Sequence, residues 1–401
     1  MIAVIGGGAA GFFAAIHAAA AGSEVIIFEK GTKLLAKVRV SGGGRCNVTN
    51  GVDTLSGLLE GYPRGFKELR GPFTRFNNQD TMRWFQERGV NLKTEGDGRV
   101  FPTSDNSLTI VNCLINEANA MGVKVMTGVA VETISPHQGA FRLVTNGRSF
   151  DAEKVIVTSG GAPKKDAYGW LSDLGLTIIA PVPSLFTFNV PQSPFLDLMG
   201  LSVQDALVSV TGSKFKSRGA LLFTHWGLSG PAVLRTSAMA ARFLNELGYQ
   251  FEVVVDFLPD INADEMRDQI KSHARTSPRK KVESLKWEGL SSRLWDRICS
   301  IAEMREGLDL GNLSNHTLNR LVEAVKQCRF QVSGKTTFKE EFVTCGGVAL
   351  EEIDFKSMES KRVPGLYFAG EVLDIDGVTG GYNFQAAWTT GYIAGNAASG
   401  K

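Results

Sequence analysis

The sequence predicts an α/β protein whose N-terminal strand–turn–helix–strand unit is matched by a strand–turn–helix unit at the C-terminus, with different material inserted between them. Three observations predict this fold class. An apolar run over 2–5 precedes a glycine turn and an Ala-rich amphipathic run over 12–21. Prolines cluster over 181–194, where short β-type runs begin. Residues 363–371 form an apolar strand that ends in glycine and an acid, followed by a small-residue helix over 385–398.

The N-terminal turn has the spacing G-x-G-x-x-G, formed by Gly6, Gly8 and Gly11. Gly6 permits the tight turn, Gly8 lets a pyrophosphate approach the backbone, and Gly11 lets helix and strand pack closely. The helix that follows offers unpaired N–H groups and a partial positive charge to phosphates. Glu29 ends the second apolar run, where its carboxylate can accept hydrogen bonds from ribose hydroxyls. The whole unit predicts a dinucleotide site in preference to a merely glycine-rich turn.

Length and composition limit the remaining possibilities. With 401 residues the chain is too long for one ordinary core, so two or three domains are expected. A net charge of +2 argues against a protein that coats nucleic acid, but it does not exclude a local basic patch. No apolar run approaches the ~20 residues of a membrane span, and the N-terminus does not resemble a signal peptide. The five cysteines are an odd number without a CxxC pair, which favours a cytoplasmic location, with no disulfides and no metal site.

The stretch S-G-G-G-R-C-N-V-T-N at 41–50 is the second unusual segment. Three consecutive glycines followed by Arg, Cys and Asn do not suit an ordinary helix or strand. The backbone is expected either to bend sharply or to approach a ligand closely. A flexible linker is the alternative, and the dense polar side chains that flank the glycines disfavour it.

Basic helical material is expected over 57–99, a helix over 107–121, and strand-like runs over 123–131, 141–145 and 154–158. The last of these runs closes in Thr158-Ser159-Gly160-Gly161, a small-residue end that suits a chain crossing beneath a bound cofactor.

The inserted material falls into two parts. Short β-type runs separated by glycine turns predict a small barrel or sandwich, and they include 185–190, 206–211, 219–223 and 251–257. A motif T-H-W-G-L-S-G-P at 224–231 precedes a helix over 232–245. The pattern then turns helical over 259–328, with twelve Lys or Arg and eleven Asp or Glu. That balance predicts a helical module with a mixed surface, not a basic arm.

Near the C-terminus, a helix opens on Gly380 and Gly381 directly after an apolar strand and a polar turn. Such an opening presents free N–H groups and the positive end of the helix dipole. This end of the helix can stabilise negative charge on the N1/O2 edge of a reduced flavin, and Glu371 suits a bond to a polyol hydroxyl. An ordinary C-terminal βα unit is the alternative.

Three motifs carry a family resemblance: S-G-G-G-R-C-N-V-T-N (41–50), T-H-W-G-L-S-G-P (224–231) and G-L-Y-F-A-G-E-V-L-D-I-D-G-V-T-G-G-Y-N-F-Q-A-A (365–387). They resemble the BaiN/RdsA family of FAD-dependent flavoproteins, within the two-dinucleotide-binding-domain superfamily. The likeness runs through essentially the whole chain. It implies a split Rossmann-like FAD-binding domain (1–187 and 341–401), an inserted β-barrel domain (188–258 and 329–340), and a helical insert within that barrel (259–328).

The resemblance also implies which residues contact the cofactor. The glycine turn and Glu29 would hold the ADP half, the 41–50 loop would lie near the flavin, Glu371 would meet the ribityl chain, and residues 380–383 would lie at the isoalloxazine. The full set expected to contact FAD is Gly6, Gly8, Ala9, Ala10, Gly11, Glu29, Lys30, Lys37, Ser41, Gly42, Gly43, Arg45, Cys46, Asn47, Val129, Ser159, Gly160, Gly161, Gly370, Glu371, Gly380, Gly381, Tyr382 and Asn383.

A flavin moves hydride, so the chain needs a proton donor if it reduces a C=C bond. Cys46, Tyr382 and His225 are the candidates. Arg45 beside Cys46 is expected to favour the thiolate and lower the thiol pKa. The alternative for Cys46 is a small packing residue in a tight loop, and a lone histidine such as His225 is more often structural.

The family's members include a bile-acid enone reductase, a ribosomal RNA dihydrouridine synthase and small-amine oxidases, and fold does not choose between them. A local basic patch could hold RNA phosphates, and its residues are Lys33, Arg39, Arg64, Lys67, Arg70 and Arg75. The leading hypothesis is reduction of a uridine in 23S ribosomal RNA. The alternatives are a small-molecule enone reductase or amine oxidase and, third, a non-catalytic binding protein.

The chain has no second G-x-G-x-x-G turn and hence no dedicated nicotinamide domain. NADH or NADPH, if it is the electron donor, must visit the flavin pocket transiently, which predicts ping-pong kinetics. The choice between the two donors and the oligomeric state stay open.

Overall fold

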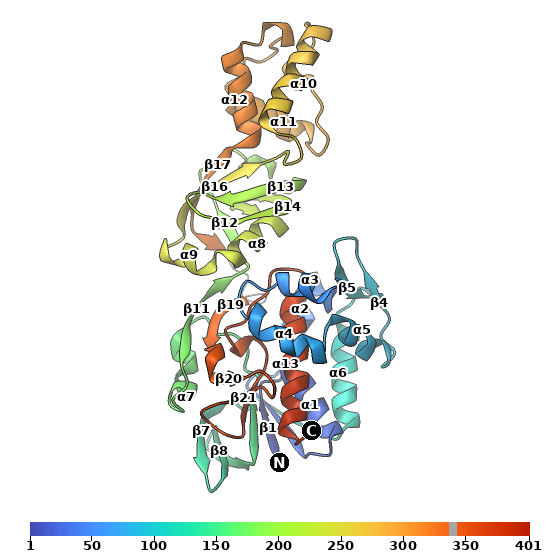
Figure 1. The fold of residues 1–401 in the computed structure, drawn as a ribbon, viewed down its shortest axis with the longest axis vertical. Coiled ribbons are helices and arrows are strands. Elements are labelled where there is room, and N and C mark those ends of the chain that lie inside the picture. The colour runs from blue at the N-terminus through green and yellow to red at the C-terminus, as the bar shows by residue number, and fades with distance from the viewer. Residues whose placement is uncertain (337–342) are drawn as a thin grey trace. The chain divides into compact units, whose positions relative to one another are not determined.

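The computed structural model describes residues 1–336 and 343–401, which form two compact units (Figure 1). The first unit contains Met1–Ser184 and, after the undescribed segment, residues 343–401; the second contains residues 185–336. The first unit is therefore interrupted in sequence by the second. The sequence predicts the first domain boundary between residues 187 and 188, and the structure divides the two units three residues earlier, between Ser184 and Leu185. The predicted boundary at 340/341 lies outside the described residues.

A seven-stranded sheet, ordered β20-β21-β22-β10-β1-β2-β6, forms the centre of the first unit. Its strands are β20 (Ile353–Asp354), β21 (Glu359–Ser360), β22 (Leu366–Phe368), β10 (Lys154–Val157), β1 (Ile2–Ile5), β2 (Val25–Glu29) and β6 (Lys124–Thr127). The five strands from β22 to β6 pair in parallel, and Ile2 lies between Val25 and Lys154. Strands buried on both faces need continuous apolar runs, which explains the sequences of β1 and β10. The predicted α/β fold with a Rossmann-type domain is confirmed.

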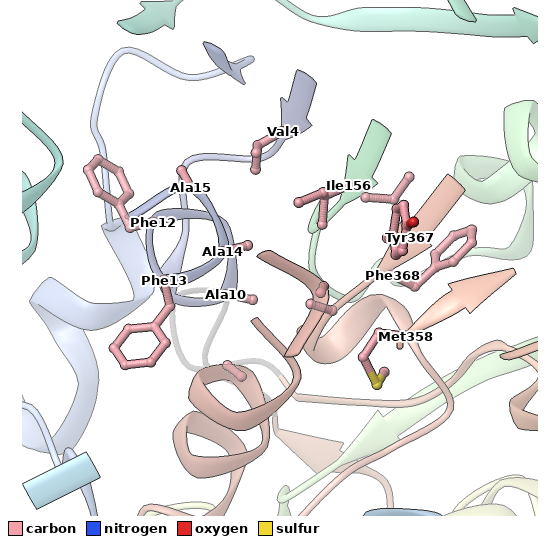
Figure 2. Close-up of a cluster of buried hydrophobic side chains, with 14 of the residues drawn as sticks. Val4, Ala10, Phe12, Phe13, Ala14, Ala15, Ile156, Met358, Tyr367 and Phe368 are labelled. Atoms are coloured by element: carbon pink, nitrogen blue, oxygen red, sulfur yellow. The ribbon is translucent and has the colours of Figure 1, made fainter. Parts of the chain in front are cut away.

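Helices α1 (Ala9–Ala20) and α13 (Tyr382–Ala398) pack directly on each other. A Cβ on Gly391 would lie 2.8 Å from the carbonyl oxygen of Ala10, and one on Gly395 would lie 2.3 Å from that of Ala14. In Figure 2, Ala10 and Ala14 lie on the side of α1 that faces the strands, whereas Phe12 and Phe13 point away from them. Gly391 and Gly395 of α13 are thus required by the close approach of this helix to the backbone of α1.

The remaining helices of the first unit are α2 (Ala36–Gly44), α3 (Leu55–Glu60), α4 (Phe66–Arg75), α5 (Asn78–Gln86), α6 (Leu108–Ala120) and α7 (Gly169–Ser172). Three small antiparallel sheets complete it: β3 (Thr49–Asn50), β5 (Arg99–Pro102) and β4 (Leu92–Thr94); β7 (Val131–His137), β8 (Ala140–Thr145) and β9 (Arg148–Ala152); and β11 (Ile178–Ser184) with β19 (Val343–Val348).

The second unit is built on a sheet ordered β17-β16-β13-β14-β15-β12-β18. Its strands are β17 (Cys328–Ser333), β16 (Gln250–Asp256), β13 (Ser202–Val210), β14 (Lys216–Thr224), β15 (Gly227–Ser229), β12 (Thr187–Asn189) and β18 (Lys335–Thr336). The two end strands, β17 and β18, are separated in the chain by Gly334 alone. The sheet must therefore curl until its ends meet, which closes the expected barrel.

Helices α8 (Pro231–Met239) and α9 (Ala241–Glu246) follow β15, so the single helix expected over 232–245 is broken at Ala240. The helical insert connects β16 to β17 and contains α10 (Ala263–Thr276), α11 (Ser292–Ile301) and α12 (Asn315–Lys326). Asn262 and Glu265 form a capping box at the start of α10. Within the described residues, no helix combines the length and the apolar character needed to cross a membrane.

Candidate functional site

The glycine turn between β1 and α1 has the geometry that its spacing predicts. A Cβ on Gly6 would lie 2.4 Å from the carbonyl oxygen of Thr158, and one on Gly11 would lie 1.9 Å from that of Gly6. Both glycines are therefore required by close packing of the turn against β10 and α1. Gly8, the N-cap of α1, is different, because a Cβ there would meet nothing within 4 Å. This open space in front of a helix N-terminus fits a pyrophosphate.

Glu29 is held at the end of β2 by two backbone donors. Its Oε2 accepts a hydrogen bond from the N–H of Gly7 at 2.7 Å, and its Oε1 accepts one from Gly31 at 2.6 Å. The backbone N–H of Val129 donates to the Glu29 carbonyl at 2.9 Å. These bonds fix the carboxylate beside the glycine turn, where a ribose would need it.

The 41–50 loop bends as its glycines predict. Inside α2, Ser41 is extended (φ −60°, ψ 148°), and Gly42 and Gly43 are left-handed with φ of 59° and 68°. Cys46 is also left-handed, with φ of 62°. A Cβ on Gly42 would contact Phe101 and Asn47, but one on Gly43 would meet nothing within 4 Å. The loop therefore combines a packed side with an open side, and the linker alternative is excluded.

The start of α13 docks on the end of this loop. The side chain of Asn50 donates to the carbonyl of Gly380 at 3.1 Å, and the Thr49 hydroxyl donates to Gln385 Oε1 at 2.6 Å. Gly381, the N-cap of α13, has φ of 91°, and a Cβ there would lie 2.4 Å from the Thr49 carbonyl. Only glycine fits this contact, so the two predicted flavin-end segments form one structure.

A second junction joins α2 to the C-terminal strand. Lys37 Nζ lies 2.6 Å from Glu371 Oε2, and Glu371 Oε1 accepts the N–H of Thr344 at 2.9 Å. A Cβ on Gly161 would lie 2.6 Å from Glu371 Oε1, and one on Gly370 would lie 2.8 Å from Ala10 Cβ. Residues from four distant parts of the sequence thus meet beside the N-terminus of α1.

Tyr382 and Asn383 form the first turn of α13. The Asn383 amide exchanges two hydrogen bonds with the backbone of Gly377, at 2.8 and 2.9 Å. The hydroxyl of Tyr62 donates to the Tyr382 carbonyl at 2.6 Å, and the two rings meet edge to face. Tyr382 itself is partly exposed. The turn before α13 is therefore closed by side chains, with Tyr382 at its surface.

Comparison with known families shows which family the chain belongs to. The family model described as the HI0933-like protein Rossmann domain matches residues 1–397. The chain belongs to the HI0933-like family. This is the flavoprotein family that its motifs resemble, and the chain is an FAD-dependent oxidoreductase with a Rossmann-type FAD-binding domain.

Similar proteins match the chain along nearly its full length. The 3-dehydro-bile acid delta(4,6)-reductase of Clostridium scindens is 31% identical over 99% of this chain and 98% of its own. The ribosomal RNA dihydrouridine synthase of Haemophilus influenzae is 31% identical over 97% of this chain and 96% of its own. The ribosomal RNA dihydrouridine synthase of Escherichia coli is 29% identical over 97% and 95%.

A solved structure supports the fold alone. The 3-ketosteroid-delta4-(5alpha)-dehydrogenase of Rhodococcus jostii RHA1 superposes with a TM-score of 0.53 at 14% identity, covering 100% of this chain and 96% of that one.

In this HI0933-like chain, the predicted low pKa of Cys46 is wrong. Its side chain is fully buried, and burial raises the thiol pKa to about 12, although a hydrogen bond with Ser41 opposes the shift. Arg45 does not act on the thiol as expected, because it pairs with Glu95 at 2.7 Å and its guanidinium stacks on Phe101. Cys46 is therefore a neutral thiol at physiological pH.

Arg64 is a second correction, because it does not belong to a surface patch. Its Nε donates to Asp376 Oδ1 at 2.5 Å, and its terminal nitrogen contacts the other oxygen of the same carboxylate. The Ser184 hydroxyl donates to Asp376 Oδ2 at 2.6 Å. Burial raises the pKa of Asp376, and Arg64 and Ser184 oppose that shift. Sequence reasoning missed this pair; its signal was a second acid in the D-I-D-G turn.

The other predicted residues have simpler positions. Of the proposed patch, Lys33, Lys67, Arg70 and Arg75 are exposed and Arg39 is partly exposed. Among the remaining predicted cofactor contacts, Lys30 and Ser159 are exposed, and Gly160 has φ of 74° with open space at its Cβ position. His225 belongs to the second unit, where its ring meets that of Trp226.

Proposed function

We propose that this protein reduces a C=C bond that is conjugated to a carbonyl group, and that its substrate is a uridine in 23S ribosomal RNA. Two full-length relatives named as ribosomal RNA dihydrouridine synthases carry the proposal. Converting uridine to dihydrouridine saturates one ring C=C bond next to a carbonyl. The same chemistry describes a 3-oxo, delta(4,6) substrate of the bile-acid relative. A ribosomal RNA substrate would be met in the cytoplasm.

The chain's own groups would bind the cofactor at both ends. The N-terminus of α1, with the open space at Gly8, would receive the pyrophosphate, and Glu29 would bind the ribose. The N-terminus of α13 at Gly381 would face the flavin and favour negative charge there. Once reduced by its electron donor, the bound flavin would supply hydride from its N5 position. NADH or NADPH is the proposed electron donor, and it would enter the flavin pocket before the substrate.

Tyr382 is the proposed proton donor among the three candidates. Its side chain is partly exposed on the first turn of α13, whereas Cys46 is fully buried. A general acid must reach the substrate carbon. A buried thiol with a raised pKa cannot reach that carbon and does not readily release its proton. Cys46 then packs the 41–50 loop, and His225 keeps a structural role in its turn.

Substitution separates these roles. Tyr382→Phe should lower turnover about 100-fold while the protein stays yellow, because general acid catalysis contributes on that order. Cys46→Ala should keep most of the activity and the flavin. Full activity in Tyr382→Phe, or loss of turnover with retained flavin in Cys46→Ala, would contradict the assignment.

A small conjugated enone is the second candidate substrate. The bile-acid reductase is as similar to this chain as the dihydrouridine synthase of Haemophilus influenzae, at 31% identity each. The loss of Arg64 from the expected basic patch also weakens one reason for an RNA substrate. An amine oxidase would instead release hydrogen peroxide when given a small amine.

Deleting the gene and mapping dihydrouridine in 23S ribosomal RNA tests the proposal. Loss of one modified uridine, restored by the wild-type gene but not by Tyr382→Phe, is the expected result. An unchanged map, together with reduction of a small enone by the purified protein, would favour the second candidate.

A further inference from the structure

A dense group of positive charges lies in the helical insert, from the end of α10 into the loop that follows. Residues 271–286 contain six Lys or Arg and one Glu, a net charge of +5, whereas the whole chain carries +2. Basic and acidic residues are nearly equal in number over 259–328, but they are not evenly mixed. The positive charges of this module are concentrated in residues 271–286. Figure 1 labels α10, α11 and α12 in this module.

Four of these cations are exposed and unpaired in the part of the chain that the structure describes. The side chains of Lys271, Arg275, Arg279 and Lys280 are exposed, and within the described part of the chain they make no hydrogen bond or ion pair. Lys281, by contrast, pairs with Asp309 at 2.9 Å. We call the four unpaired residues the α10 basic surface.

The loop that carries this surface is held in place by its backbone. The N–H of Leu310 donates to the carbonyl of Lys280 at 2.9 Å, and that of Gly311 donates to Pro278 at 2.8 Å. The indole of Trp295 donates to the carbonyl of Val282 at 3.1 Å. Arg279 and Lys280 are therefore free side chains on a fixed backbone, so little backbone ordering would be needed for a ligand to bind them.

Stability does not account for this arrangement. Lys271 and Arg275 are four residues apart on α10, a spacing at which like charges repel. Arg275 lies in the last turn of α10, where the helix dipole offsets part of that repulsion, but Lys271 lies before that turn. Arg279 and Lys280 follow the helix, where the dipole gives no such compensation. A cluster that repels itself and lacks internal partners is suited to an external polyanion.

We propose that the α10 basic surface binds the phosphate backbone of ribosomal RNA, an inference that rests on the proposed function. The four cations contact phosphates, which position the RNA without reading its sequence. This adds a phosphate-binding surface on the helical insert, which the expected basic patch did not include.

The test compares two fourfold glutamine variants of the FAD-loaded, full-length protein. The first replaces Lys271, Arg275, Arg279 and Lys280. The matched control replaces four other exposed cations that lack side-chain partners within the described residues: Arg148, Lys214, Lys216 and Lys401. Both variants lose four positive charges, so any effect of net charge alone is equal. The probe is 23S ribosomal RNA transcribed in vitro, and its dissociation constant is measured over a series of salt concentrations.

The first variant should bind about tenfold or more weakly at 0.1 M salt than the control variant. Its plot of log affinity against log salt should be shallower by about 3, since each phosphate contact contributes about 0.7–0.9. Its flavin absorbance should equal that of wild type, and its melting temperature should not fall, because repulsion is removed.

Equal binding by the two variants, or a lower melting temperature in the first variant alone, would overturn the inference. Failure of the wild type to bind the transcript would overturn it too. If the wild type binds and the first variant does not, yet the dihydrouridine map is unchanged by gene deletion, the proposed function fails while the RNA surface stands.

Discussion

At the scale of single residues, the glycines of the site fall into two groups. Gly6, Gly11 and Gly381 are glycine because a Cβ would strike backbone atoms of the same unit. Gly8 has an ordinary φ of −93°, and among the described residues a Cβ there would meet nothing within 4 Å, so packing does not require glycine at this position. The proposed pyrophosphate, approaching the backbone closely at the helix N-terminus, would favour glycine at this position.

Gly8→Ala therefore separates cofactor binding from folding. The apoprotein should unfold at nearly the wild-type temperature, since the N-cap change from Gly to Ala costs at most about 1 kcal/mol. Affinity for FAD, measured by titration of the apoprotein, should fall at least tenfold. Gly96→Ala, at another open position, is the control and should leave FAD affinity unchanged. Wild-type FAD affinity in Gly8→Ala would contradict the assignment of the pyrophosphate site.

His17 is a second residue whose environment sets a measurable property. Its ring lies among Phe13, Trp84 and Tyr392, with centroid distances of 4.9, 6.3 and 4.7 Å. Its Nε2 is buried without a hydrogen-bond partner among the described residues. Burial, followed by the positive charge of Arg88, lowers the pKa of His17 to about 4.

A lowered histidine pKa makes the folded state less stable in acid. Between pH 6.5 and about 4 the unfolded chain binds more protons than the folded chain, so stability falls as the pH drops through this window. The loss amounts to roughly 3 kcal/mol at pH 4. His17→Phe should flatten the dependence of the urea midpoint on pH, and His316→Phe, at an exposed position, should not. Identical slopes in wild type and His17→Phe would show that His17 does not titrate in this way.

At the scale of elements, the buried pair of Arg64 and Asp376 links the loop before α4 to the turn before α13. The pair sits where the chain would otherwise leave the Asp376 carboxylate buried and unpaired. On the same turn, the Asn383 amide and the Gly377 backbone bond to each other and complete the structure that presents Gly381. The pair is therefore a positioning device for the N-terminus of α13.

Arg64→Met should be strongly destabilising, by about 3–5 kcal/mol, because it leaves a buried charge uncompensated. The double variant Arg64→Met/Asp376→Leu should recover much of that loss. Denaturant unfolding of the four proteins gives the coupling, and the flavin absorbance of each reports the state of the turn. Arg142→Met, in the exposed pair with Asp151, is the control, and little change is expected. Additive losses in the double variant would show that the pair does not act as a unit.

At the scale of the whole molecule, the described chain combines one Rossmann-type unit with a barrel that carries helices. Among the described residues the Rossmann-type unit is the FAD-binding one, and the proposed nicotinamide donor would reach the flavin through the pocket that the substrate uses. The reductant and the substrate would then use the same face of the flavin in turn.

Alternating use of one pocket predicts ping-pong kinetics. Initial rates measured with NADH or NADPH against several substrate concentrations should give parallel lines in double-reciprocal plots. Rapid reduction of the FAD by the nicotinamide with no substrate present should agree with this scheme. Intersecting lines would mean that both molecules bind together, which requires a second site.

Much of this molecule could be predicted from local sequence. The turn at Gly6, Gly8 and Gly11 and the bend at 41–50 follow from residues that are neighbours in the chain, since glycine spacing and apolar runs act over a few positions. The fold class and the family follow from such features. Sequence by itself therefore determined what kind of site the protein has.

Tertiary structure alone decided which charged groups are free to act. The sequence predicted Arg64 as part of a surface patch, but in the structure it pairs with Asp376, which is 312 residues away in the chain. Cys46 looked activated by Arg45, but complete burial raises its thiol pKa and Glu95 holds the guanidinium. The nearly equal numbers of acidic and basic residues over 259–328 did not reveal the cations on α10 that are unpaired among the described residues. The burial and ion pairing of a charged side chain depend on residues that are distant in the chain. Short-range sequence patterns do not indicate which residues those are.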